Sequence, residues 1–463
     1  MQTISKSLVQ HFRCPEECAA FDTPEQVSAE SGYFRFDELT CYGRTSTGYR
    51  TATGDDNVCN ITARAHDGTV SLPFLPDEVV DNLRREHYAA ASRPSIARKG
   101  VRRLMNSFYY AVRPWMPVRV RKHLQRLYRR GSRNVAFPCW PNDTTVDDLM
   151  ARLLALTVRH SGQRVPFIWF WPNGATAAMT ITHDVENQAG YDLCRDVMNL
   201  DERFGFCSSF QIVPEQRYKP TVDFLNELKS AGFELNIHDL NHDGHLFRDW
   251  RTFSARVPHI RRYAGEFGAR GFRSAIMYRN PDWLPLLGFE YDMSVPNAAH
   301  LDPQSGGCCT LFPFFIGNTL ELPLTTIQDY SLLHLLNCRS IELWQQQTEL
   351  IVRKHGLATF LVHPDYIVRQ QDRAVYVHLL EYLKHVREDL NVWAVRPQEV
   401  NDWWRARAAM HLVHRDDRWY IEGPQSERAR LAFADVRDGR LTFELSGDAA
   451  KAAETPALDQ AIS

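Results

Sequence analysis

The chain has 463 residues, of which 44% are hydrophobic and 24% are charged, and its formal net charge at pH 7 is −2. This length allows two to four domains with a large buried core, and the near-neutral charge gives no reason to expect a nucleic-acid partner. No stretch approaches the roughly 20 apolar residues of a membrane span, and the N-terminus lacks the apolar segment of a signal peptide. We therefore expect a globular protein of the cytoplasm.

Ten cysteines are spread irregularly along the chain. They lack the dense, paired spacing of small disulfide-stabilised domains, so we expect free thiols in a reducing compartment. Cys14 and Cys18, which are spaced CxxxC, leave a metal or redox role as the alternative.

Residues 1–165 are predicted to form a mixed N-terminal region. The segment 72–88 predicts one helix that begins near Asp77, and no chemistry can be assigned to residues 1–92. Residues 137–172 hold two clusters of Trp and Pro, FPCWP and PFIWFWPNG. Such clusters are typical either of an arm packed against a domain edge or of a platform on which sugars stack.

Residues 93–133 are the basic part of this region, with thirteen Lys or Arg and no Asp or Glu. Apolar residues at helical spacing predict an amphipathic segment, which Pro114 and Pro117 would divide into two helices. Charge runs are usually solvated faces of helices packed on a main domain. The alternative is contact with an anionic partner, such as a membrane surface, a phosphate-bearing substrate or a nucleic acid.

From residue 166 to 405, predicted strands alternate with predicted helices. This alternation predicts parallel βα units, and about seven of them fit one distorted (β/α)7 barrel, an α/β fold. Residues 406–463 read as a small β appendage with an Ala-rich tail. The predicted barrel strands are ATAAMTITHD, FCSSFQIV, FELNIH, GFRSAIM, a strand near 291, LELPLT, ATFLVH and NVWAV.

Polar residues follow these strands where the strands end. Because the carboxyl ends of parallel barrel strands share one face, we expect those side chains to converge. Two His at positions i and i+4, with a carboxylate from elsewhere, form a catalytic metal site that keeps a position open for water. The residues concerned are Asp184, Glu186, His238, His242, Arg273, Asp292 and His363.

The order and spacing of these residues resemble the polysaccharide deacetylase family, with its nodulation-type (NodB) domain and family 4 carbohydrate esterases, over about half of the chain. THDVE resembles a variant of the family's first motif, which implies Asp184 as base and Glu186 as metal ligand. His238 and His242 match the second motif, with Asp239 in place of its Ser or Thr.

The other three motifs are matched less regularly. The third is matched at Arg273 alone, since GFRSAIM lacks the Pro that related members carry. The fourth resembles Tyr291-Asp292-Met293-Ser294, and the fifth is LVHPDY with His363. Taken together, the five motifs are fairly specific, whereas only the second is close to specific by itself.

The resemblance implies a metal-dependent hydrolase that removes an N-acetyl group from a sugar or polysaccharide precursor, with a divalent metal, expected to be zinc, on Glu186 and the two His. His363 would protonate the leaving amine, and Arg273 would hold Asp184 ionised through a charge-assisted pair. Asp292 would orient His363 or raise its pKa.

Two alternatives stay open. The irregular first and third motifs leave room for an amidohydrolase of the same fold that acts on a non-sugar amide. A barrel that has lost catalysis and binds a glycan or a partner is the second alternative, although the retained Asp184, Glu186 and His residues argue against it. His183 and His245 are expected to be supporting or structural residues, because a site with three ligands needs neither.

Overall fold

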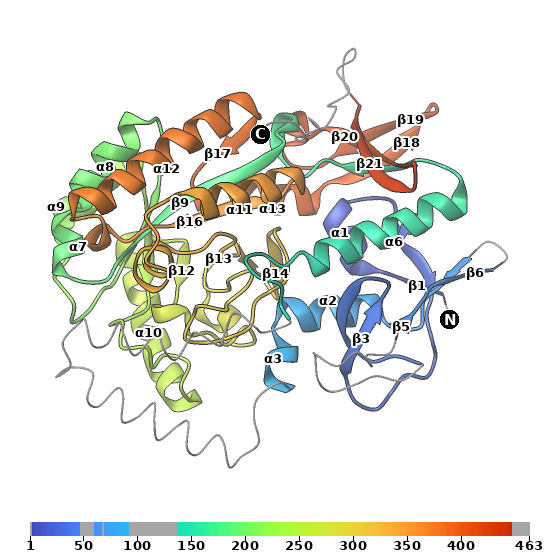
Figure 1. Cartoon of the computed structure of the whole chain (residues 1–463), viewed down its shortest axis with the longest axis horizontal. Helices are drawn as coiled ribbons and strands as arrows, with labels where there is room; N and C mark the ends of the chain where they lie inside the picture. Colours follow the sequence, from blue (N-terminus) through green and yellow to red (C-terminus); the bar gives the residue numbers. More distant parts are fainter. Residues whose placement is uncertain (1, 47–59, 67–68, 92–136, 447–463) are drawn as a thin grey trace.

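The computed structural model describes residues 2–46, 60–66, 69–91 and 137–446, so the predicted basic helices within 93–133 and the Ala-rich tail lie outside the described residues. Figure 1 shows the barrel and its helices on one side, the N-terminal region on the other, and the C-terminal hairpins beside the N-terminal region.

A curved sheet forms the core of the barrel. Seven of its strands run parallel in the order β15-β13-β12-β11-β10-β9-β16; β14 adds to β15 in the antiparallel sense and β17 pairs with β9 in parallel. This sheet confirms the predicted α/β barrel of about seven units. The strands are β9 (Ala177–Val185), β10 (Ser209–Ile212), β11 (Glu234–His238), β12 (Gly271–Arg273), β13 (Tyr291–Asp292), β14 (Phe314–Ile316), β15 (Thr319–Glu321), β16 (Leu357–Leu361) and β17 (Val392–Ala394).

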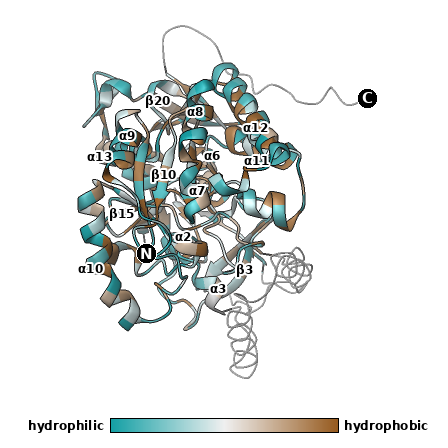
Figure 2. Cartoon of the chain, turned by 90° about the vertical axis from the view of Figure 1, so that its left-hand side faces the viewer, coloured by the Kyte–Doolittle hydropathy of each residue, from teal (hydrophilic) through white to brown (hydrophobic). Residues whose placement is uncertain are grey.

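Helices surround this sheet, and Figure 2 shows hydrophilic and hydrophobic residues alternating along α10 and α12, as expected for helices with one face on the core. Side-chain caps fix where some of them begin: Asp249 accepts from the Thr252 amide at the start of α10. The helices are α7 (Gln188–Asp192), α8 (Cys194–Arg203), α9 (Val222–Ser230), α10 (Trp250–Phe267), α11 (Glu342–Arg353), α12 (Gln370–Asp389) and α13 (Pro397–Ala409), with short 3-10 helices η4 (Pro172–Gly174), η5 (Ala275–Met277), η6 (Leu284–Leu287) and η8 (Pro364–Tyr366) and the π-helix η7 (Tyr330–Leu335).

The barrel closes between the segment after β15 and strand β16. Thr325 Oγ1 donates to the Leu357 carbonyl (2.6 Å), and Thr326 Oγ1 donates to the Thr359 carbonyl (2.8 Å). Side-chain hydrogen bonds thus take the place of a backbone ladder at this seam. They hold the end of β16 beside the loop that follows β15.

In the part of the N-terminal region that the structure describes there are two small sheets and four helices, of which α6 continues towards the barrel. The segment 72–88, predicted as one helix, is two, because Glu86 adopts a left-handed conformation (φ 60°) between them. The sheets run β1-β2-β7-β6 and β4-β3-β5. The elements are β1 (Gln2–Ile4), α1 (Lys6–Phe12), η1 (Glu16–Ala19), β2 (Ala20–Asp22), β3 (Gly32–Phe36), β4 (Leu39–Gly43), β5 (Asn60–Ile61), β6 (Arg64–His66), β7 (Thr69–Ser71), α2 (Pro76–Arg84), α3 (His87–Ala91) and α6 (Thr145–Ser161).

The C-terminal part forms two hairpins, and the second is extended by β8, which precedes the barrel in sequence. The predicted domain boundary at residue 166 lies inside β8. The buried aromatic side chains of PFIWFWPNG pack beside this sheet, where Phe167 contacts Phe443. The strands are β8 (Val165–Ile168), β18 (His411–Arg415), β19 (Arg418–Glu422), β20 (Leu431–Arg437) and β21 (Arg440–Leu445), with the turn η9 (Ser426–Arg428) between β19 and β20.

Two further expectations concern membranes and thiols. Within the part of the chain that the structure describes, no helix combines the length and the apolar character needed to cross a membrane. The cysteines of that part, Cys14 and Cys18 among them, are free thiols as predicted, and Cys59 lies outside it.

Candidate active site

The candidate site lies at the carboxyl ends of β9, β11, β12 and β16, where the parallel strands bring distant residues together. Asp184 belongs to β9, His238 ends β11, Arg273 ends β12, and His363 follows β16 by two residues. All four side chains are buried. The sequence predicts that these residues converge. Ion pairs or hydrogen bonds link Asp184, His238 and Arg273, and His363 lies 3.3 Å from Glu186.

Glu186, His238 and His242 form a group of donor atoms that lie within 4.8 Å of one another. His242 Nε2 is 2.9 Å from Glu186 Oε1, and His238 Nε2 is 3.8 Å from the same oxygen. The predicted metal ligands are therefore neighbours in space. One carboxylate and two imidazoles are a donor set that suits a catalytic zinc ion with an open position.

The environment of His238 suits a metal ligand. Its Nδ1 lies 3.1 Å from the Arg273 carbonyl oxygen, which sets the ring orientation; in the neutral ring with Nδ1 protonated, Nε2 is the acceptor nitrogen. Nε2 is buried and has no hydrogen-bond partner in the described structure. Buried polar atoms are nearly always paired, so an unpaired imidazole nitrogen that faces a carboxylate is what a metal ligand requires.

The loop between the two His adopts an unusual backbone. Asp239 and His242 both have positive φ, at 55° and 54°, a region that residues other than glycine seldom occupy. Arg217 holds the loop by donating to the Asn241 carbonyl (3.1 Å) and to the His242 carbonyl. Backbone held in such conformations concentrates at functional sites, where surrounding contacts maintain it.

Asp184 is paired with Arg273, as predicted. Arg273 Nη1 donates to Asp184 Oδ1 and also to Thr182 Oγ1, both at 2.8 Å. Burial raises the pKa of the Asp184 carboxyl, but Arg273, His238 and His363 together outweigh burial and lower it below its ordinary value. The carboxylate thus stays ionised inside the protein.

His363 is held by Asp329, a residue that the sequence motifs did not single out. Asp329 Oδ1 lies 2.6 Å from His363 Nδ1, and Asp329 Oδ2 accepts from the His363 backbone amide (2.7 Å). On the other side, His363 Nε2 is 3.3 Å from Glu186 Oε1. Burial lowers the pKa of His363, but the charges of Asp329 and Glu186 outweigh burial and raise it well above its ordinary value.

Asp292 has a different role from the one expected. Its two oxygens accept from the Ser294 amide (2.8 Å) and the Ser294 hydroxyl (3.2 Å), so the carboxylate shapes its own strand end. Burial raises the pKa of the Asp292 carboxyl, and the acidic side chain that interacts with it is Glu321. The carboxylate that orients His363 is Asp329, which corrects the expectation for Asp292. A loop of eight residues after β15 brings Asp329 to this position, and no strand-end motif marks it.

The loop after Arg273, at GFRSAIM, takes an unusual path. Ile276 and Met277 have φ of 60° and 55°, and a β-branched residue in this region is a genuine outlier. Arg279 Nη1 donates to the Met277 carbonyl (2.9 Å), and Arg279 Nε donates to Glu86 of the N-terminal region (2.8 Å). A buried ion pair with the N-terminal region thus supports the loop beside Arg273.

His183 is buried and joins β9 to helix α8 and to the segment that follows β16. Its Nδ1 is 2.9 Å from the Val362 carbonyl oxygen and its Nε2 is 2.9 Å from Asp201 Oδ2. Tyr376 and Ser208 donate to the same carboxylate. His245 is half-exposed and pairs with Asp243. Neither His belongs to the group of ligand atoms, in agreement with their expected supporting roles.

Comparison with known proteins gives structural matches alone: no family model and no curated protein matches the chain. A candidate polysaccharide deacetylase from Mycobacterium smegmatis matches with 16% identity and a TM-score of 0.41, over 52% of this chain and 94% of that one. The Puue allantoinase matches with 15% identity and a TM-score of 0.42, over 51% and 92%. A second candidate polysaccharide deacetylase, from Pseudomonas aeruginosa, matches with 13% identity and a TM-score of 0.40, over 51% and 93%. Each of these matches covers about half of this chain and more than nine-tenths of the other.

Proposed function

We propose that the chain is a divalent-metal-dependent hydrolase that removes the acetyl group from an N-acetylated sugar or polysaccharide precursor. One observation carries this proposal. A single buried face holds a set of three ligands, a carboxylate paired with Arg, and an imidazole paired with a second carboxylate. These are the groups that metal-assisted amide hydrolysis needs: a metal site, a base and an acid.

Glu186, His238 and His242 would hold the metal, and zinc is the ion that best suits two imidazoles and a carboxylate. When bound there, such an ion lowers the pKa of a water molecule and polarises the carbonyl of the acetyl group. The unpaired, buried Nε2 of His238 supports the assignment.

Asp184 is the proposed general base. Its carboxylate lies 3.6 Å from His238 Nε2, so it is next to the ligand group without belonging to it. Arg273 keeps Asp184 ionised and fixes its orientation, so that the free oxygen can accept a proton from the attacking water. A base that is buried and already oriented needs little reorganisation during the reaction.

His363 is the proposed general acid. Its raised pKa keeps the imidazole protonated near neutral pH, and its Nε2 faces Glu186 while Asp329 holds the other ring nitrogen. In this position it can donate a proton to the nitrogen that leaves when the C–N bond breaks. The proposed substrate class follows from the resemblance of the five motifs to the deacetylase family.

The test combines metal analysis with acetate release. Purified protein is expected to hold one equivalent of metal per chain and to release acetate from at least one member of a panel of N-acetylated sugars. Asp184→Asn should keep the metal and release no acetate, which controls for contaminating enzymes. Metal binding with turnover of non-sugar amides alone would make the substrate class wrong. A protein without bound metal would contradict the ligand assignment.

A further inference from the structure

Three apolar side chains project from the face of the barrel that holds the candidate active site. Val222 is 71% exposed, Val368 58% and Trp250 55%, whereas the other exposed large apolar side chains of the described residues are each 40–45% exposed. Exposed apolar residues that stand singly are ordinary, but those that gather on one face mark an interaction surface. We propose that these three residues, here called the apolar rim, dock this face of the barrel on an anionic lipid bilayer.

All three residues stand where the chain leaves a barrel strand and begins a helix. Val222 is the first residue of α9, which follows β10, and Trp250 is the first residue of α10, which follows β11. Val368 lies just before α12, which follows β16. A helix that follows a parallel strand begins near the carboxyl end of that strand. The apolar rim therefore lies at the end of the barrel that carries the candidate catalytic residues.

Helix α7 links two members of the rim to the candidate site. Its Tyr191 hydroxyl lies 3.3 Å from the Thr221 hydroxyl, next to Val222. The same helix contacts η8, the short helix between His363 and Val368. Figure 1 shows α7 and α9 at the left-hand edge of the barrel, the side that Figure 2 turns towards the viewer. The rim and the proposed proton donor are thus parts of one face.

The charges around the rim are those that an anionic surface attracts. In the segments 219–223, 248–251 and 367–370, four cations stand against two acids: Lys219, Arg248, Arg251 and Arg369 against Asp223 and Asp249. Arg248 pairs with Asp249 (2.8 Å), whereas the other three cations form no ion pair with an acidic side chain of the described residues. These cations are exposed and remain available to lipid headgroups.

The basic segment 93–133 begins on the Trp250 side of the rim. Trp250 contacts Trp283, with ring centroids 5.4 Å apart. Oδ1 of the neighbouring Asp282 lies 3.6 Å from Nε2 of His87, where α3 begins. This helix ends two residues before the segment 93–133, which has thirteen cations and no acid. The sequence thus adds a large positive charge next to the rim.

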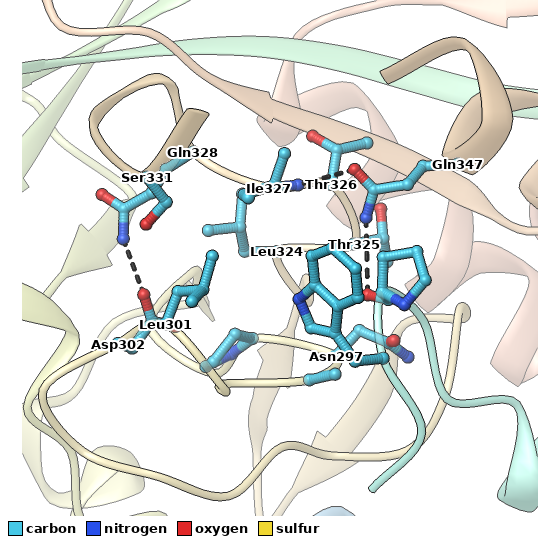
Figure 3. A pocket seen from close by; sticks show the side chains of 14 residues that line it. Asn297, Leu301, Asp302, Leu324, Thr325, Thr326, Ile327, Gln328, Ser331 and Gln347 are labelled. Atoms are coloured by element: carbon cyan, nitrogen blue, oxygen red, sulfur yellow. Dashed lines mark hydrogen bonds between the residues drawn. The ribbon is translucent and has the colours of Figure 1, made fainter. Parts of the chain in front are cut away.

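The shape of the rim favours a bilayer over a partner that binds in a groove. None of its three side chains lines the pocket of Figure 3, between the loop 296–302 and the segment 324–331, whose Leu301 and Leu324 are buried. Apolar side chains that project among cations fit the surface of a membrane, where an indole and aliphatic groups enter below the headgroups and the cations stay among them. The contact is peripheral, because no described helix could cross the bilayer.

The test measures binding of the full chain to sedimented vesicles. Vesicles of equal parts phosphatidylglycerol and phosphatidylcholine are compared with vesicles of phosphatidylcholine alone. The native protein should bind the anionic vesicles more tightly and be released at high salt. Trp250→Ser should lower the partition coefficient about tenfold and Val368→Ser about threefold, because each withdraws an apolar side chain from the bilayer. Arg251→Gln should lower it about fivefold on anionic vesicles, the effect of one cation.

Leu390→Ser is the matched control. Leu390 is 40% exposed and follows the last residue of α12, so a helix about 30 Å long separates it from Val368. This variant should bind as the native protein does. Asp184→Asn should also bind as the native protein does, because the proposed contact does not depend on catalysis.

The outcomes keep this surface apart from the proposed function. Vesicle binding that the rim variants weaken, without acetate release by the native protein, would support the rim and contradict the deacetylase. Rim variants that bind anionic vesicles as tightly as the native protein would overturn the rim and leave any binding to the segment 93–133. An equal loss in Leu390→Ser would overturn it too, as would a dimer in sedimentation velocity that Val368→Ser dissociates.

Discussion

Asp329→Asn is the substitution that most directly tests His363 as proton donor. In the structure both carboxylate oxygens of Asp329 accept from His363, one from the ring Nδ1 side (2.6 Å) and one from the backbone amide (2.7 Å). An Asn side chain has one acceptor oxygen and one NH₂ donor. Whichever way it turns, a donor faces a donor, so the protonated, oriented imidazole loses part of its support.

The expected loss is large and depends on pH. Removing a positioned general acid costs about 10²- to 10⁴-fold in kcat, or about 3–5 kcal/mol of barrier. Burial lowers the pKa of His363 and Asp329 contributes most to raising it, so the substitution should move that pKa downward. The acid is active when protonated: activity is present below its pKa and is lost as pH rises through it. The alkaline limb of kcat should therefore shift to lower pH.

The assay is acetate release measured across pH, with metal content and melting temperature determined for each variant. Asp292→Asn is the matched comparison, because it makes the same change at a buried carboxylate whose oxygens bind Ser294. The alkaline limb of kcat for Asp292→Asn should lie at the same pH as that of the native protein. An Asp329→Asn protein with native kcat and an unmoved alkaline limb would refute His363 as the acid held by Asp329.

Three further predictions address the metal, stability and the basic segment. His242→Ala should lose the metal, whereas Asp184→Asn should keep it; equal loss in both would make Asp184 a ligand. Burial raises the pKa of Asp147 to about 7 in the folded protein. Between pH about 4 and 7 the folded state therefore holds a proton on Asp147 that the unfolded state has lost. The free energy of unfolding should fall as pH rises through this range, by at most about 4 kcal/mol. Asp147→Asn should flatten that part of a pH series of urea unfolding curves, and an unchanged slope would contradict it. Residues 93–133 are predicted to bind anionic liposomes at low salt, at about 1 kcal/mol per cation near the surface; absence of co-sedimentation would leave them as packing elements.

The sequence predicted the parts of the site that lie at strand ends. Asp184, His238, Arg273 and His363 could be placed because parallel strands deliver their carboxyl ends to one face. Asp329 could not, because it stands eight residues beyond the end of β15 and reaches His363 through a loop. The path of a loop depends on packing that local sequence patterns do not encode. The sequence therefore favours Asp292, which ends a strand, as the carboxylate that orients His363.

The boundaries of the regions were predicted less well than the barrel. The predicted boundary at residue 166 divides β8, a strand that the sequence did not indicate and that pairs with β20, more than 260 residues later. The path of the loop at Ile276 could not be predicted either, because a β-branched residue with positive φ contradicts local backbone preference. Arg279 supports this loop by donating to the Met277 carbonyl. Both features follow from contacts between segments far apart in the chain.

The buried ion pair between Glu86 and Arg279 links the N-terminal region to the loop that follows β12. Breaking one partner of a buried pair costs about 3–5 kcal/mol, because the other charge is left buried and alone. A substitution at residue 86 therefore affects residue 279, although one belongs to the N-terminal region and the other to the loop beside Arg273. A protein that exchanged its N-terminal region for another would leave Arg279 buried without its partner, in the loop that follows Arg273. The Glu86–Arg279 pair thus makes the stability of the loop beside Arg273 depend on the N-terminal region.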